Sequence, residues 1–166
     1  GAWQRAELQR LGGFDERLVR NQDDELALRI VRGGGQVWQS AAIRSWYTPR
    51  ASFAALFRQF FQYGYWKVPV IRKHRLPASP RHLAPVLFVL VLAALALAAL
   101  FWPAARAGLV ALLTVYALAA LGNAAPLASP WRVPRQWLGI AWAFVCMHLG
   151  YGLGFARALF ELAVLR

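Results

Sequence analysis

Acidic side chains and sulfur are scarce in this sequence. Its 166 residues contain seven Asp and Glu against nineteen Lys and Arg, which gives a formal net charge of +12, and they contain a single cysteine, Cys146. One cysteine excludes an internal disulfide, and the nearby His148 is more typical of packing in an apolar helix than of a metal ligand. The positive charge favours either nucleic acid or the anionic headgroups at a membrane surface as a partner.

The second half of the sequence lacks charge. From Leu83 onward there is no Lys and no Asp, only five Arg and one Glu. Three stretches, at residues 83–102, 107–128 and 137–155, are long and apolar enough to cross about 30 Å of hydrocarbon as helices. A buried core helix would explain one such stretch, but three in succession predict a membrane region. None follows a short basic segment at the N-terminus, so a cleaved signal peptide does not account for them.

The basic residues near the predicted spans are unequally distributed. One side of the membrane would hold Lys67, Arg72, Lys73, Arg75, Arg81, Arg132 and Arg135, and the other would hold Arg106, Arg157 and Arg166. Cytoplasmic segments carry the excess of Lys and Arg. The sequence therefore predicts a multi-pass protein of the inner (cytoplasmic) membrane, with its polar N-terminal part in the cytoplasm and its C-terminus outside.

The polar half predicts three helices and one strand. A short helix at residues 5–14 ends in a glycine pair, and a second at residues 23–32 has Asn21 as its N-cap and three glycines after it. Residues 36–47 carry Val, Trp, Ile and Tyr and predict a strand. A third helix is expected to begin at Ser52 and to run to about Arg72, with an interruption near Pro69.

The third predicted helix mixes aromatic and basic side chains. Its aromatic residues are Phe53, Phe57, Phe60, Phe61, Tyr63, Tyr65 and Trp66. This composition is typical of a helix that lies in a membrane interface with its aromatic side down. It is also found on surfaces that stack single-stranded nucleic acid. Because a predicted span follows closely and no nucleic-acid-binding motif is present, we favour the interface and expect membrane lipids, not nucleic acid, as the partner.

Three of the seven acidic residues are adjacent: Asp23, Asp24 and Glu25. Successive side chains on a helix diverge by about 100°, so the three cannot serve one site. Carboxylates favour the positive end of a helix dipole, but that effect alone does not explain three of them. One carboxylate that faces a cleft could serve as a general base, while its neighbours pair with Arg or point to solvent.

Two longer stretches carry a resemblance to a known family. Residues 11–35, LGGFDERLVRNQDDELALRIVRGGG, resemble the acceptor-side half of family 2 glycosyltransferases, which show a GGFDE segment, an acidic ED-x-(D/E)-L motif and a Gly-terminated helix. Residues 47–67, YTPRASFAALFRQFFQYGYWK, are similar to a stretch of succinoglycan-type exopolysaccharide glycosyltransferases. Those enzymes also end in a few membrane helices, and a segment like HLGYGLGF at residues 148–155 is common in the last helix.

The resemblance implies a fold and an activity. The implied fold class is an α/β fragment, the C-terminal part of a GT-A glycosyltransferase domain at residues 1–51. An amphipathic interfacial helix and basic linker would follow at residues 52–82, and an all-α membrane region of three transmembrane helices at residues 83–166. The implied function is transfer of a sugar, with inversion, from a UDP-glucose-like nucleotide sugar to a lipid-linked saccharide acceptor in exopolysaccharide synthesis.

The same resemblance implies roles for individual residues. Asp23 would be the general base, with Asp24 as the fallback if the register is off by one, and Glu25 would be a supporting residue. A Q-x-x-R-W motif of many relatives maps onto residues 59–63, where Gln62 replaces the usual Arg and removes a positive charge near the diphosphate. The side chains implied in substrate binding are Arg58, Gln59, Gln62, Tyr63, Trp66 and Lys67, and Arg58 or Lys67 is expected to compensate for the missing charge.

The donor-binding half of such an enzyme, with its D-x-D motif, is not found in these residues. A divalent cation, Mg or Mn, is therefore expected in the full-length enzyme with its ligands outside this chain. We expect the chain to be the C-terminal piece of a longer protein and to be inactive alone. The alternative hypothesis is a small non-catalytic membrane protein that binds anionic lipid or a partner subunit through its basic aromatic helix. In that case Asp23 would be dispensable, and Lys67, Arg72 and Lys73 would be needed.

Overall fold

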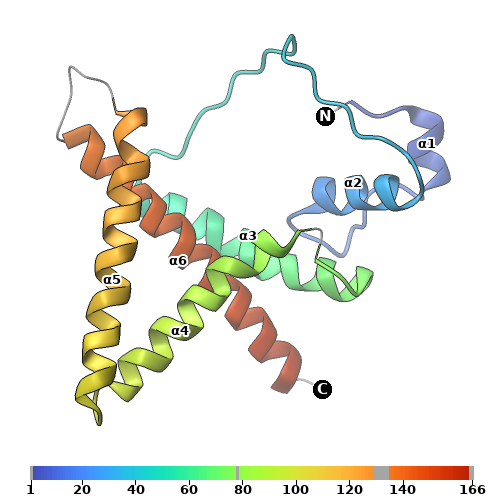
Figure 1. The fold of residues 1–166 in the computed structure, drawn as a ribbon. Helices are drawn as coiled ribbons and strands as arrows, with labels where there is room; N and C mark the ends of the chain where they lie inside the picture. The colour runs from blue at the N-terminus through green and yellow to red at the C-terminus, as the bar shows by residue number, and fades with distance from the viewer. Residues whose placement is uncertain (1, 78, 129–134, 165–166) are drawn as a thin grey trace.

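The computed structural model describes residues 2–77, 79–128 and 135–164, and these residues are helical wherever they have regular secondary structure. In chain order the elements are α1 (Arg5–Arg10), α2 (Gln22–Arg32), α3 (Phe53–His74), η1 (Pro80–Leu83), α4 (Ala84–Ala98), α5 (Pro103–Ala124), η2 (Ala125–Leu127) and α6 (Arg135–Val164). Figure 1 shows α1 and α2 at one side of the molecule, and α3 in contact with the group formed by α4, α5 and α6.

The first two predicted helices are confirmed. Helix α1 is followed by Gly12 and Gly13, both with positive φ (77° and 74°), a conformation that glycine adopts without a steric penalty. Helix α2 begins after Asn21, as predicted, but the Asn21 side chain does not cap it. Its amide instead donates a hydrogen bond to the carbonyl of Tyr63 on α3, at 3.0 Å. The residue expected to cap a helix thus joins two helices.

The predicted strand at residues 36–47 is wrong. This segment contains no strand and arcs away from the helices in Figure 1. Trp38 is 85% exposed and Trp46 is fully exposed, so the apolar side chains that suggested a strand have no covering layer. A strand needs a second strand to accept and donate its backbone hydrogen bonds, and the described residues form none. The predicted α/β fragment is therefore not seen in the described part of the chain.

Helix α3 continues without interruption through Pro69, so the predicted break is also wrong. Ser52 caps its start as predicted, accepting a hydrogen bond from the Ala55 amide at 3.2 Å. Val68 and Val70, on either side of the proline, are both buried, and Val68 packs in one core with Phe155 of α6. We attribute the continuity of α3 to this packing, which outweighs the missing hydrogen bond at proline.

Helices α3 and α6 cross in backbone contact. A Cβ atom added at Gly154 would lie 2.0 Å from the carbonyl oxygen of Phe61, and one at Gly150 would lie 2.7 Å from that of Phe57. On the opposing helix, a Cβ at Gly64 would lie 2.0 Å from the carbonyl oxygen of Tyr151. This is the close approach that small residues four apart allow between helices in membranes. It gives a structural reason for the glycines of the HLGYGLGF segment.

The three predicted membrane spans are confirmed as helices. Pro80–Ala98, Pro103–Leu127 and Arg135–Val164 are each long and apolar enough to cross a membrane. The first span ends earlier than predicted, because the chain turns after Ala98 and α5 begins at Pro103. Most of the surface of the first two spans is exposed, as expected for helices that face lipid.

Candidate active site

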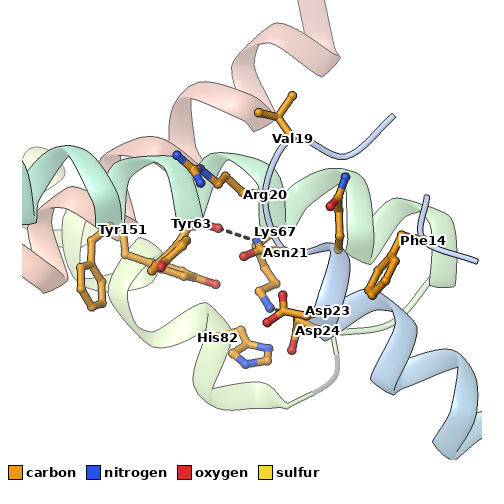
Figure 2. Close-up of a pocket in the computed structure, with 12 residues that line it drawn as sticks. Phe14, Val19, Arg20, Asn21, Asp23, Asp24, Tyr63, Lys67, His82 and Tyr151 are labelled. Carbon is orange, nitrogen blue, oxygen red and sulfur yellow. Dashed lines mark hydrogen bonds and ion pairs between the residues drawn. The ribbon is translucent and has the colours of Figure 1, made fainter. Parts of the chain in front are cut away.

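A cleft of about 530 Å³ lies where α2 meets α3, η1 and α6 (Figure 2). We call it the carboxylate cleft. Its lining residues are Phe14, Val19, Arg20, Asn21, Gln22, Asp23, Asp24, Phe60, Tyr63, Lys67, His82 and Tyr151. The cleft thus collects two of the predicted acidic residues, two predicted substrate-binding residues of α3, and side chains from the first and third spans.

The start of α2 is held against α3 by the side chain of Asn21, whose Nδ2 donates to the carbonyl of Tyr63. This residue has a left-handed conformation, with φ 63°, which Asn tolerates better than most side chains. The turn directs its amide to the Tyr63 carbonyl and places the first turn of α2 over the cleft. The sequence analysis identified Asn21 only as a helix cap, but Asn is also a residue that tolerates this left-handed conformation.

Asp23 and Asp24 both line the cleft but differ in their partners. The ammonium group of Lys67, whose side chain is only 8% exposed, forms an ion pair with Asp24. No hydrogen bond or ion pair engages the Asp23 carboxylate within the part of the chain that the structure describes. Figure 2 shows Lys67 reaching from α3 to the start of α2, with His82 nearby. Asp23 therefore has the carboxylate that is free to meet a ligand.

Glu25 points the other way and is fully buried. Its carboxylate accepts a hydrogen bond from Arg29 Nε at 3.0 Å, lies 2.8 Å from Lys73 Nζ, and lies 2.9 Å from His74 Nε2. Burial alone would raise the pKa of Glu25, but the hydrogen bonds from Lys73, His74 and Arg29 outweigh it and leave the pKa below its ordinary value. The residue is thus a structural anchor, and it takes no part in the cleft.

Glu25 belongs to a wider group of charges that we call the ionic cluster: Asp15, Glu25, Arg29, Lys73 and His74. Arg29 also donates to the carbonyls of Leu11 and Gly13, at 2.5 and 2.6 Å, and Lys73 Nζ lies 2.6 Å from Asp15. The pKa of Asp15 is well below its ordinary value because the guanidinium of Arg17 and the ammonium of Lys73 both donate to it. The cluster ties the α1–α2 turn to the end of α3.

Two polar atoms on the wall of the cleft are buried without a protein partner. They are Nδ1 of His82 and the hydroxyl of Tyr151, and no described residue bonds to either of them. A buried polar group without a partner destabilises a fold, so such groups are rare unless a ligand or water meets them. Neither residue was singled out from the sequence, because their proximity to Asp23 depends on how the spans pack.

A second, smaller pocket of about 240 Å³ adjoins the cleft. We call it the arginine pocket. It is lined by Arg20, Arg50, Ala55, Arg58, Gln59, Gln62 and Tyr63. Arg20 and Tyr63 line both hollows, which are therefore neighbours.

The predicted substrate-binding residues are largely brought together. Tyr63 and Lys67 line the carboxylate cleft, and Arg58, Gln59, Gln62 and Tyr63 line the arginine pocket. Trp66 lines neither, and its ring packs edge-on against Tyr65 with the centroids 5.6 Å apart. Arg20 and Arg50 were missed. Arg20 lies three residues before Asp23 and Arg50 lies in the YTPR segment, so both stand close to the motifs in the sequence.

Within the described residues, no three His, Cys, Asp or Glu side chains lie close enough to hold a metal ion. Asp23 and Asp24 face a cleft whose other charged side chains are Lys67 and Arg20. This donor set does not suit a divalent cation, which prefers several oxygen ligands. We therefore derive no chemical step in this cleft from a metal.

The chain is similar to the succinoglycan biosynthesis protein ExoA of Rhizobium meliloti (strain 1021), with 32% identity over 151 residues. The match covers 91% of this chain and 44% of the relative, so the chain spans less than half of that protein's length. No family model matches the chain, and no solved structure matches it. The similarity confirms the resemblance to succinoglycan-type exopolysaccharide biosynthesis proteins that the motifs indicated.

Proposed function

We propose that this chain is the acceptor-side part and membrane anchor of an inverting family 2 glycosyltransferase. The enzyme transfers a sugar from a nucleotide-diphosphate donor, UDP-glucose or a close analogue, to a lipid-linked saccharide in exopolysaccharide synthesis. The observation that carries the proposal is the carboxylate cleft, in which Asp23 lies without a partner among the described residues, next to a predicted membrane span. The similarity to a succinoglycan biosynthesis protein supports the same activity.

The chemistry requires a base at this position. An acceptor hydroxyl attacks the anomeric carbon of the donor sugar while the nucleoside diphosphate leaves from the opposite face, through an oxocarbenium-like transition state. As the new bond forms, the hydroxyl proton passes to a carboxylate, and a well-placed general base accelerates such a step by about 10² to 10⁴. A divalent cation held elsewhere in the complete enzyme would neutralise charge on the leaving diphosphate.

Asp23 suits the role of base better than Asp24. The Lys67 ammonium already pairs with Oδ2 of Asp24 and restrains that carboxylate, whereas no described residue pairs with the Asp23 carboxylate. Asp23 is exposed and lines the same cleft. In this account Asp24 and Lys67 hold α2 in register with α3, while Asp23 accepts the proton.

The position of the cleft suits an acceptor that enters from the membrane. His82 lies in η1 at the start of the first span, and Tyr151 lies in α6, the third span. The unpartnered His82 nitrogen and Tyr151 hydroxyl would hydrogen-bond saccharide hydroxyl groups next to the lipid anchor. With the polar half in the cytoplasm, the lipid-linked saccharide would be elongated at the cytoplasmic face of the inner membrane.

The alternative hypothesis, a non-catalytic protein that binds lipid or a partner through Lys67, Arg72 and Lys73, has less support. Lys67 is buried and paired with Asp24, and Lys73 is engaged by Asp15 and Glu25. Of the three, only Arg72 is an exposed residue without an ion pair to a described residue. A surface that binds anionic lipid needs several free cations.

Paired substitutions in the complete membrane protein test the proposal. Sugar transfer from UDP-glucose and related nucleotide sugars to the lipid fraction is measured for Asp23→Asn and Asp24→Asn, with membrane insertion as the control. We expect Asp23→Asn to lower the rate by about 10² to 10⁴ without loss of insertion, and Asp24→Asn to lower it less. Near-normal transfer by Asp23→Asn would contradict the proposal.

A further inference from the structure

Helix α6 has the length and composition of a membrane span, but its buried contacts with the hairpin of α4 and α5 lie at one end of that hairpin. This open end is formed by the start of α4 and the end of α5. The buried residues of α4 are Val86 and Val89, in its first two turns, and those of α5 are Ala120 and Ala124, in its last two turns. The turn of the hairpin lies away from α6 (Figure 1).

The first part of α6 packs against the last turns of α5. Ala141 shares a core with Ala120 and Ala124, and Ala124 is fully buried. Further along α6, Nδ1 of His148 lies 3.0 Å from the hydroxyl of Tyr116. All of these α5 residues belong to the half of the helix that is nearer to the open end of the hairpin.

The later part of α6 packs against the first turns of α4. A Cβ atom added at Gly152 would lie 2.4 Å from the carbonyl oxygen of Pro85, and Ala158 shares a core with Val86. Because an α-helix rises about 1.5 Å per residue, Ala141 and Ala158 are about 25 Å apart along α6. A span that ran down beside the hairpin over this length would reach the far end of α4. Helix α6 instead crosses from the end of α5 to the start of α4 and stays near the open end.

The last turns of α6 are tied to α3. The hydroxyl of Tyr65 donates a hydrogen bond to Glu161 at 2.6 Å, and Nε of Arg157 donates one to the same carboxylate at 2.8 Å. Tyr65 lies two residues before Lys67, whose ammonium pairs with Asp24 of the polar half. Charged side chains are unfavourable within hydrocarbon. Both ends of α6 therefore lie close to the membrane surface that carries the polar half.

One face of α6 is left uncovered by the described helices. That face carries the large exposed side chains of Leu138, Trp142, Leu153, Phe160 and Val164. Since successive residues on a helix are rotated by about 100°, these five fall within an arc of about 80°. A continuous apolar face of this length marks a surface that binds a partner or a membrane. Because α6 packs on two helices that themselves expose apolar surface, acyl chains are the partner that fits it.

We propose that α6 is not a third crossing, and that α3 and α6 together lie in the membrane leaflet on the side of the polar half. Helices α4 and α5 are then the two crossings, and both ends of α6 are on the same side as the polar half. The uncovered face of α6 contacts the acyl chains of this leaflet. Arg157 then joins the basic residues beside the polar half, which agrees with the excess of Lys and Arg in cytoplasmic segments. This arrangement follows from helix contacts and does not depend on sugar transfer.

Thiol labelling of the complete protein determines the side on which α6 ends. All native cysteines, including Cys146, are first replaced by Ala. Single cysteines are then introduced by Val164→Cys at the end of α6, by Ser40→Cys in the polar half, and by Ala104→Cys next to the hairpin turn. With a membrane-impermeant maleimide, we expect Val164→Cys and Ser40→Cys to be labelled only in inverted vesicles, and Ala104→Cys only in right-side-out vesicles. The proposal is overturned if Val164→Cys is labelled in right-side-out vesicles or in neither kind, or if Ala104→Cys is labelled in inverted vesicles.

Cross-linking in native membranes tests the path of α6 across the hairpin. In the same cysteine-free background, the pair Val86→Cys/Ala158→Cys joins two residues of one core, whereas Leu95→Cys/Ala158→Cys joins α6 to the far half of α4. A short bifunctional thiol reagent that enters the membrane is added to both. We expect a cross-link in the Val86 pair and none in the Leu95 pair. Any other result overturns the proposal, because a third crossing would bring Ala158 beside Leu95.

A spin label identifies what covers the outer face of α6. Phe160→Cys places the label on that face, and Ala158→Cys places it in the core as the control, each in the complete protein reconstituted in lipid. We expect the label at 160 to be accessible to oxygen and inaccessible to a water-soluble nickel chelate, and the label at 158 to be inaccessible to both. Access of the chelate to the label at 160 would mean that the face is in water. Exclusion of both reagents there would mean that a second copy or another protein segment covers the face, and either result contradicts contact with acyl chains.

Discussion

On one face of α2 the Asp23 carboxylate is exposed at the carboxylate cleft, whereas on the other face the Glu25 carboxylate is fully buried among Arg29, Lys73 and His74. The two residues are separated by a single position and belong to one acidic motif. Asp24 lies between these extremes, lining the cleft but paired with Lys67.

The contrast shows how one short run of acids serves two purposes. A buried carboxylate must be surrounded by cations and donors, because an isolated charge inside a protein is very unfavourable. The contacts that Glu25 makes also join the α1–α2 turn to the end of α3. A carboxylate that is to accept a proton must instead be open to its substrate. The helix provides both because adjacent side chains point in different directions.

The largest effect of a substitution is expected at the contact between α3 and α6, because α3 carries partners of both faces of α2. Gly154→Leu would place a side chain at the point where an added Cβ lies 2.0 Å from the Phe61 carbonyl, and backbone cannot easily yield there. We expect α3 to separate from α6 and the protein to lose its accumulation in the membrane. Gly122→Leu is the matched control, since a Cβ at Gly122 meets nothing within 4 Å. Equal accumulation of the two variants would contradict the backbone contact.

The ionic cluster should respond to loss of its central charge. Glu25→Gln leaves Arg29 and Lys73 without the carboxylate that they share. We expect the free energy of unfolding of the polar half to fall by about 3 kcal/mol or more, measured by thermal or denaturant unfolding. Glu16→Gln, at an exposed position of the preceding turn, should change it by less than about 0.5 kcal/mol. A similar change for both would mean that the cluster does not stabilise the fold.

Low pH should weaken the buried face of α2, where Glu25 lies in the ionic cluster. The folded-state pKa values of Glu25 and Asp15 are lowered, so their stabilising contribution is complete above their ordinary pKa values, about 4.3 and 3.9. It is lost as the pH falls through the lower folded-state values. We expect the unfolding midpoint to decrease below about pH 4.5, and to decrease less steeply in Glu25→Gln. A parallel decrease in both proteins would contradict the role of Glu25.

The smallest effect is expected at the Tyr151 hydroxyl. Because no described residue bonds to it, Tyr151→Phe should leave the unfolding midpoint unchanged or slightly higher, while the KM for the acceptor rises several-fold. Tyr116→Phe is the comparison, since the Tyr116 hydroxyl lies 3.0 Å from Nδ1 of His148, and its loss should cost about 1 kcal/mol. A destabilising Tyr151→Phe would mean that the hydroxyl has a partner in the folded protein.

The sequence was sufficient for those features that depend on local patterns. The spans follow from unbroken apolar runs, and α1 and α2 follow from their glycines and their periodicity. The strand at residues 36–47 was wrong because a strand depends on a partner that the described chain does not form. The break at Pro69 was wrong because tertiary packing, not local propensity, decides whether a helix continues.

The site could be predicted only in part for the same reason. The acidic motif identified Asp23 and its neighbours, but not which of them faces a cleft. The contact of Arg20 with Gln62 joins residues from the α1–α2 loop and from α3, and no local pattern specifies it. The glycines of the last helix were visible in the sequence, and the structure supplied what they contact.

The most direct test of the separation between the two faces of α2 is a side-by-side measurement on Asp23→Asn and Glu25→Gln in the complete protein. Sugar transfer and the thermal unfolding midpoint are determined on the same membrane preparations. We predict that Asp23→Asn lowers the transfer rate by about 10² to 10⁴ at an unchanged midpoint, whereas Glu25→Gln lowers the midpoint and retains transfer below it. An active Asp23→Asn, or a Glu25→Gln that keeps the parent's unfolding midpoint but transfers no sugar, would contradict this prediction.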